Sequence, residues 1–148
     1  MFLPIALTWL HFICIFALVS LLLQERKILS MNWSLDTAKA LLATDRWFGL
    51  SAMTVLASGF ARVFFEKGEA YYFSNFFFWS KLAMFIIAGL ISIYPTVQFL
   101  RWRKPIQAGQ TPEFSVDARR KVTRAIHAQM LLVLLIPLCG VLMARGYG

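Results

Sequence analysis

Four long apolar runs follow one another along the chain, separated by shorter polar or basic segments. They cover approximately residues 2–23, 46–65, 80–100 and 122–144. Each run provides the roughly 20 apolar residues that a helix needs to cross a bilayer. The pattern therefore predicts an all-α polytopic membrane protein with a single domain over residues 1–148, folded as an antiparallel bundle of four transmembrane helices.

The connections between the runs also carry structural signals. Residues 28–45 mix apolar and polar positions, and Ser34 or Asp36 is placed to cap a helix. This pattern predicts a short amphipathic helix that lies in the membrane interface before the second span. The order Thr111-Pro112-Glu113 is typical of a helix start, so we expect the last helix to begin there.

Composition and charge narrow the function classes. The chain is 59% hydrophobic and 15% charged, whereas soluble domains have about 45–50% apolar and about 25% charged residues. The net charge of +8 comes from basic residues at the ends of the apolar runs rather than from one face of a soluble fold. We therefore expect the lipid bilayer, and no nucleic acid, as a partner.

His11 is the clearest candidate for chemistry, because it lies about nine residues into the first apolar run and ionisable groups inside a span are functional candidates. A neutral imidazole can ligate haem iron or another metal. The alternative is a structural histidine that is hydrogen-bonded to a hydroxyl group on the second helix. The residue pattern leaves both interpretations open.

Arg62 and Lys81 lie near the ends of the second and third spans, on the same side of the membrane as the start of the first. Long basic side chains in such positions often extend to water. If they point inward, they would hold the propionates of a haem or another anionic group. His127 lies at a different depth from His11, so we do not expect the two histidines to ligate one haem iron.

Three parts of the sequence carry a resemblance to known families: His11, the run 78–82 (FWSKL) and the stretch 89–102 (GLISIYPTVQFLRW). With these the chain resembles an uncharacterised family of small bacterial four-helix inner-membrane proteins. More distantly it is similar to HemJ-type protoporphyrinogen oxidases and CopD-like membrane proteins. The HemJ-like resemblance implies a haem b in the bundle, with His11 as its ligand and Lys81 matching the lysine that opens the third helix.

Two functions are compatible with these features. The first is a haem-binding membrane redox protein, with His11 as the axial ligand and with Arg62 and Lys81 holding anionic groups. The second is a non-catalytic accessory subunit or assembly factor that packs against itself or a larger membrane complex. The small residues of the second span, which suit close helix contacts, favour the second function. The sequence leaves open whether the protein is an enzyme.

The basic residues also predict the orientation in the membrane. Cytoplasmic connections carry an excess of Lys and Arg. One side carries Arg26, Lys27, Lys39, Arg46, Arg101, Arg103, Lys104, Arg119, Arg120, Lys121 and Arg124, and the other carries Arg62, Lys67, Lys81 and Arg145. Both termini should therefore lie outside the cytoplasm, on the periplasmic side of a bacterial inner membrane.

Reporter fusions test this orientation. A reporter that is active only in the cytoplasm should give a signal when fused after Gln110, within the basic third connection, and none when fused at the C-terminus. A cytoplasmic signal from the C-terminal fusion would contradict the predicted orientation.

Overall fold

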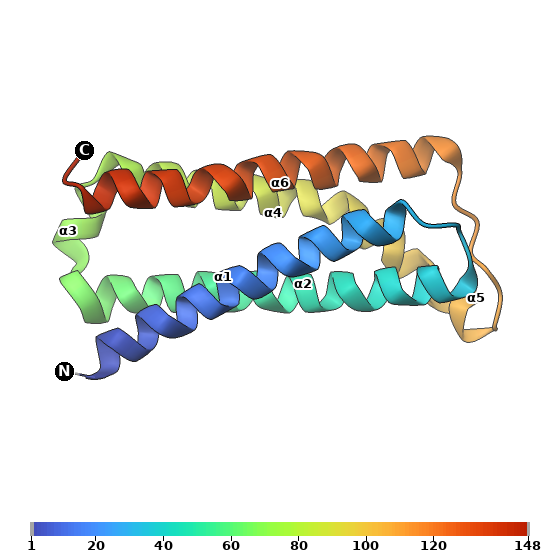
Figure 1. Cartoon of the computed structure of the whole chain (residues 1–148), viewed down its shortest axis with the longest axis horizontal. Coiled ribbons are helices and arrows are strands. Elements are labelled where there is room, and N and C mark those ends of the chain that lie inside the picture. The colour runs from blue at the N-terminus through green and yellow to red at the C-terminus, as the bar shows by residue number, and fades with distance from the viewer. Residues whose placement is uncertain (1, 148) are drawn as a thin grey trace.

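The computed structural model describes residues 2–147 and contains four long helices. They are α1 (Phe2–Leu29), α2 (Leu35–Arg62), α4 (Phe76–Arg101) and α6 (Val116–Ala144). All four are long and apolar enough to cross a membrane, and successive long helices run in opposite directions (Figure 1). The predicted all-α four-helix fold is confirmed.

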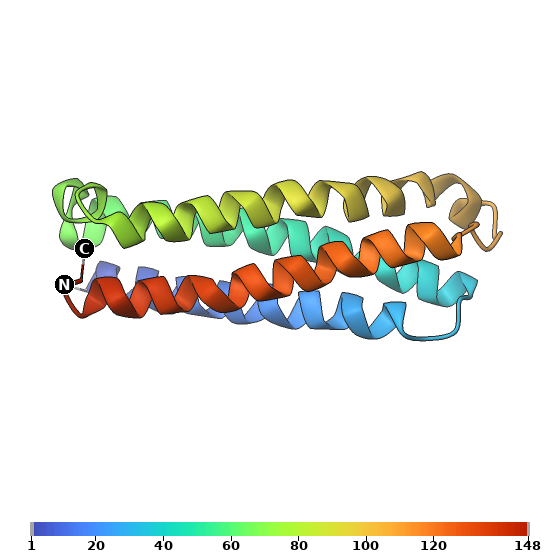
Figure 2. The ribbon, with the colours of Figure 1, turned by 90° about the horizontal axis from the view of Figure 1, so that it is seen from above.

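Shorter helical segments lie at the two ends of the bundle. The π-helix η1 (Val63–Lys67) and α3 (Glu69–Phe73) connect α2 to α4, and α5 (Arg103–Gln107) follows α4 at the opposite end. Both termini lie at the end that holds α3 (Figure 2). We call this end the terminal end, and the opposite one, which carries α5 and most of the basic residues, the basic end.

The region between the first two spans differs from the prediction, because no separate interfacial helix forms there. Instead, α1 continues to Leu29 and α2 already begins at Leu35. Ser34 and Thr37 form a capping box, in which each side chain accepts a hydrogen bond from the backbone N–H of the other residue. The apolar side of this segment, including Ala38 and Leu41, is buried in the bundle rather than in the headgroups.

The start of the last helix also differs from the prediction. Residues 110–115 are not helical, and α6 begins at Val116 after Ser115, whose side chain accepts a hydrogen bond from the backbone N–H of Ala118. Pro112 has a different role, because its carbonyl accepts a 2.9 Å hydrogen bond from the indole of Trp33. This contact joins the first and third connections.

An aromatic cluster fills the core of the basic end. Trp33, Trp102 and Phe114 contact one another with ring centroids 4.8–4.9 Å apart, and Phe99 lies 5.1 Å from Trp102. The 28 residues of α1 span about 42 Å, which exceeds the roughly 30 Å hydrocarbon core. Because the polar residues concentrate at the basic end, we expect this end to extend beyond the hydrocarbon, and it has an apolar core of its own.

The terminal half of the bundle is packed less tightly. α1 packs along α2 and α4 packs along α6, but α1 diverges from α6 towards the N-terminus (Figure 1). No residue between 2 and 17 of α1 or between 130 and 142 of α6 is buried. Val63, Tyr72, Phe78 and Met143 form a separate small core at the far terminal end. The two helix pairs therefore separate between these two cores.

Replacing Trp102 should test how much the basic-end core contributes to stability. Trp102 is 3% exposed, so Trp102→Ala should lower the free energy of unfolding by about 3–5 kcal/mol. Denaturant titration of the detergent-solubilised protein measures this change. Trp47→Ala is the matched control, because Trp47 is 61% exposed and its loss should change stability by only about 0.5 kcal/mol. Equal losses from the two variants would contradict a core role for Trp102.

Candidate functional site

His11 is positioned on α1 by a hydrogen bond to α2. Its Nδ1 lies 2.8 Å from the hydroxyl oxygen of Ser58, and that hydroxyl is also 2.7 Å from the carbonyl oxygen of Thr54, to which it donates. Because a hydroxyl has only one proton to donate, the bond from Ser58 to Thr54 favours the tautomer in which Nδ1 of His11 carries the proton of this contact. The hydroxyl partner predicted as an alternative for His11 is confirmed, and Nε2 is left as the nitrogen with a lone pair.

Gly59 allows the close approach of the His11 ring. A Cβ atom at this position would lie 3.3 Å from Cε1 of His11, which is tighter than ordinary van der Waals contact. By contrast, a Cβ at Gly49 or Gly89 would meet nothing within 4 Å. Ser58 and Gly59 together therefore hold the imidazole against the backbone of α2.

Arg62 forms an ion pair with Glu66, which lies one helical turn further along the chain. Its guanidinium donates to both carboxylate oxygens of Glu66, at 2.8 and 3.2 Å, and the phenol of Tyr72 donates to the same carboxylate at 3.1 Å. The spacing of four residues is one at which side chains meet on a helix, so the Arg62–Glu66 pair was accessible from the sequence. Tyr72 comes from α3, and no local spacing indicates it.

Lys81 has aromatic neighbours instead of a carboxylate. Its ammonium lies 5.7 Å from the ring centroid of Tyr72 and 5.2 Å from that of Phe78, distances at which a cation is attracted to a ring face. Within residues 2–147, no carboxylate lies within 4.0 Å of this ammonium. Lys81 is therefore a half-buried cation without an ion-pair partner in the described part of the chain.

The structure brings the three predicted site residues into one region. The charges of Arg62, Lys81 and Glu66 all act on the imidazole of His11. His127, in contrast, is exposed near the basic end, where its Nε2 accepts a 2.7 Å hydrogen bond from Arg26. We call the first group the terminal-end polar cluster, which consists of His11, Ser58, Arg62, Glu66, Tyr72 and Lys81.

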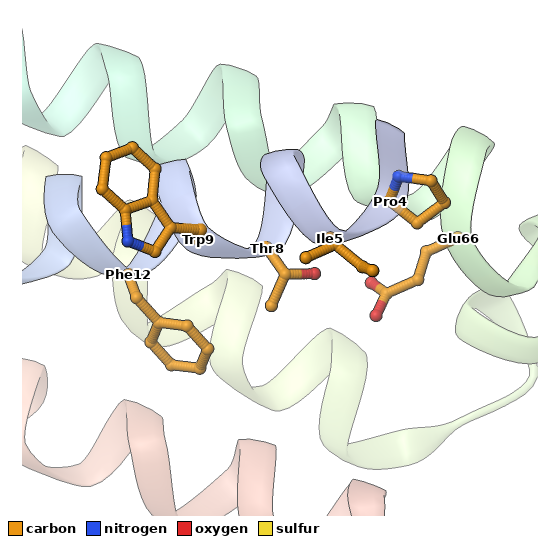
Figure 3. A pocket seen from close by; sticks show the side chains of 6 residues that line it. All are labelled: Pro4, Ile5, Thr8, Trp9, Phe12 and Glu66. Atoms are coloured by element: carbon orange, nitrogen blue, oxygen red, sulfur yellow. The ribbon is translucent and has the colours of Figure 1, made fainter. Parts of the chain in front are cut away.

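Two grooves lie on the surface of the bundle. The first, of about 350 Å³, runs along the terminal half of α1 and is lined by Pro4, Ile5, Thr8, Trp9, Phe12 and Glu66. Figure 3 shows the Glu66 carboxylate pointing towards Ile5 across this groove. The second, of about 490 Å³, lies between α2 and α4, and its lining includes Gly49 and Gly89. His11 lines neither groove.

Comparison with known proteins identifies the family. The model of a family described as "Predicted membrane protein (DUF2214)" matches residues 3–148. The chain belongs to this family. No curated protein and no solved structure matches the chain, so these comparisons do not show the more distant resemblance to HemJ-type and CopD-like proteins. This DUF2214 protein is thus a membrane protein with four candidate spans.

Tyr72 lies in the short helix α3, outside the spans, and its titration tests the terminal-end polar cluster. Burial, together with the negative charge of Glu66, raises the pKa of the Tyr72 phenol to about 12. In absorbance titrations of tyrosinate, the wild type should show a step near this pH that Tyr72→Phe lacks. The control Tyr147→Phe removes an exposed tyrosine and should keep that step.

The same shift predicts how stability changes with pH. Because the folded state raises this pKa, the contribution of Tyr72 to stability is complete below the ordinary phenol pKa of about 10 and is lost as pH rises towards about 12. Thermal unfolding of Tyr72→Phe should therefore depend less on pH across that window. An identical pH dependence in wild type and variant would contradict the buried contact with Glu66.

Proposed function

We propose that this DUF2214 protein is a haem-binding membrane redox protein in which His11 is the axial ligand of the iron. Lys81 and Arg62 are the groups proposed to hold the anionic propionates. The proposal includes the bacterial inner membrane and termini on the periplasmic side. A bound haem b would supply reversible one-electron transfer at its iron.

The hydrogen bond between His11 and Ser58 is the observation that carries this proposal. Metal-ligating histidines almost always donate their other ring N–H to a protein partner, which fixes the tautomer and the ring orientation. The Ser58 hydroxyl lies 2.8 Å from Nδ1 of His11 and donates its own proton to Thr54, an arrangement that suits donation from Nδ1 and a lone pair on Nε2. The donor set of the cluster therefore suits iron ligation.

Lys81 and Arg62 differ in whether they already have a carboxylate partner. Lys81 has no carboxylate partner in the described chain, so its ammonium can pair with a propionate directly. Arg62 already pairs with Glu66, and it would have to exchange that carboxylate for a propionate. Lys81 is therefore the main anion-binding group of the proposed site.

Space for a planar group comes from the loose packing of the terminal half. The groove along α1 holds about 350 Å³ and is open to the surroundings. His11 lies on the neighbouring stripe of α1, which faces Ser58 on α2. Haem binding at His11 therefore requires α1 to turn or tilt, and the absence of buried residues between positions 2 and 17 means that little packing opposes such a movement.

The accessory-subunit function is favoured by a different observation. Gly49 and Gly89 line the α2–α4 groove, and neither is approached by any other part of the described chain. Glycine inside a helix costs about 1 kcal/mol relative to alanine, and small residues in membrane helices mark close helix contacts. These two glycines would be explained by a transmembrane helix of a second copy or a larger complex lying in the groove.

An absorption spectrum separates the two functions. Protein purified after haem-sufficient expression should show a Soret band if it binds haem. His11→Gln should abolish that band while leaving the bundle folded, because loss of a hydrogen bond within a membrane bundle averages only about 0.6 kcal/mol. His127→Gln is the matched control and should retain the band.

Two results would contradict the haem proposal or its site. A wild-type protein that has full helicity by circular dichroism but no Soret band would leave the accessory function as the better explanation. A His11→Gln variant with an unchanged haem spectrum would show that His11 is not the ligand.

A further inference from the structure

A second group of polar side chains, three buried and one half-buried, lies towards the basic end, one from each long helix. It consists of Glu25 on α1, Asp45 on α2, Thr96 on α4 and Gln129 on α6, which we call the four-helix polar layer. Glu25 and Gln129 are each 1% exposed and Asp45 is 4% exposed. The haem proposal uses none of these residues, so the layer needs its own explanation.

A hydrogen bond links two of these residues, and the contacts of their neighbours place the others at a similar level along the bundle. Thr96 donates a 2.8 Å hydrogen bond to Oδ1 of Asp45, which joins α4 to α2. The charge of Asp45 also acts on Glu25, so α1 and α2 bring the two carboxyl groups near each other. On the α6 side, Arg26 and His127 are bonded to each other, and they lie beside Glu25 and Gln129 in the sequence.

The layer has more hydrogen-bond acceptors than donors. Oε1 of Glu25 and Oε1 of Gln129 are buried and have no hydrogen-bond partner among the described residues. Pro95, which precedes Thr96 and is fully buried, has no N–H, so the carbonyl of Ile91 loses its helical donor. Buried polar atoms are normally paired, so the two side-chain oxygens indicate a missing hydrogen-bond donor.

The hydrogen bonds that the donors of the layer form go to acceptors other than Oε1 of Glu25. Thr96 donates to Asp45, and the side-chain amide of Gln129 donates to the carbonyl of Ala125 in its own helix. The neighbouring Arg26 donates through Nε to His127. None of these groups therefore provides a proton to Oε1 of Glu25.

We propose that the four-helix polar layer is a proton-binding site, in which Glu25 is a neutral carboxylic acid that donates to Oε1 of Gln129. A single proton on Oε1 of Glu25 changes that atom from an acceptor to a donor, so it satisfies both unpartnered oxygens at once. It also removes the cost of burying a carboxylate that has no cation partner. Asp45 suits the charged form, because its carboxylate already accepts a hydrogen bond.

The surroundings restrict exchange of this proton to one side. Leu18 and Leu22 are buried on α1 between Glu25 and the terminal end, and they separate the layer from that end. The ionisable groups around the layer are Arg26 on α1, Asp45 and the exposed Arg46 on α2, Arg101 on α4, and the exposed Arg124 and His127 on α6. The site should therefore exchange protons with the water at the basic end.

Infrared spectroscopy of the whole protein in lipid tests the proposal directly. At neutral pH the wild type should show the C=O stretch of a neutral carboxylic acid, and Glu25→Gln should lose it. Glu66→Gln is the matched control and should keep the band, because Glu66 is paired with Arg62 as a carboxylate. Asp45→Asn should also keep it, because Glu25 holds the proton.

A second variant tests whether Gln129 accepts the hydrogen bond from the neutral carboxyl group of Glu25. Gln129→Leu removes the acceptor and should move the carboxylic acid band to the higher frequency of an unbonded group, while Gln98→Leu on α4 should leave it in place. This measurement is independent of whether Glu25→Gln folds.

Three results would overturn the proposal. A wild-type spectrum without a neutral carboxylic acid band at neutral pH would show that both carboxyl groups are ionised. Loss of the band on addition of Na⁺ at constant pH would show that the layer binds a metal cation in place of the proton. A band that persists in Glu25→Gln or is unmoved in Gln129→Leu would place the proton elsewhere.

Discussion

The hydrogen bond from Trp33 to the carbonyl of Pro112 fixes the arrangement on which the rest of the bundle depends. It joins the connection between α1 and α2 to the connection between α4 and α6, and Trp102 packs against both from the end of α4. Hydrocarbon provides little hydrophobic drive between helices, so a core outside the hydrocarbon is where water can drive helix association. Because the α1–α2 and α4–α6 pairs are held together at the basic end, their terminal halves can remain loosely packed.

The polar residues inside the bundle also differ between the loosely packed terminal half and the tightly packed half near the basic end. In the loose terminal half, the hydrogen bonds and the ion pair of the cluster form between residues close in the chain or within one helix pair, as with His11 and Ser58 or Arg62 and Glu66. In the tightly packed half, Thr96 on α4 bonds to Asp45 on α2, and Glu25 on α1 and Gln129 on α6 are almost completely buried. Tight packing thus creates the stricter requirement for charge neutrality, and loose packing leaves room for a ligand.

The sequence was sufficient for the four spans and for placing His11, Arg62 and Lys81 near one end, since hydropathy and charge position are properties of single segments. It did not separate an interfacial helix from the first turns of α2, because the stripe formed by Ala38 and Leu41 is apolar whether it faces headgroups or a core. It also did not indicate that Thr96 bonds to Asp45 or that Tyr72 bonds to Glu66. Those contacts depend on the rotation of one helix relative to another, which local spacing does not encode.

The π-helix η1 has a consequence for how this chain can change over evolution. Its five residues, Val63–Lys67, hold the turn in a wider spacing than an α-helix, which corresponds to one inserted residue. Five residues in the wide turn rotate the chain by about as much as four residues of α-helix, so deleting one residue there would remove the wide turn and leave α3 in nearly the same orientation. A change of one residue in length should therefore be easier to accommodate in this segment than inside α2 or α4, where it would rotate the rest of the helix by about 100°.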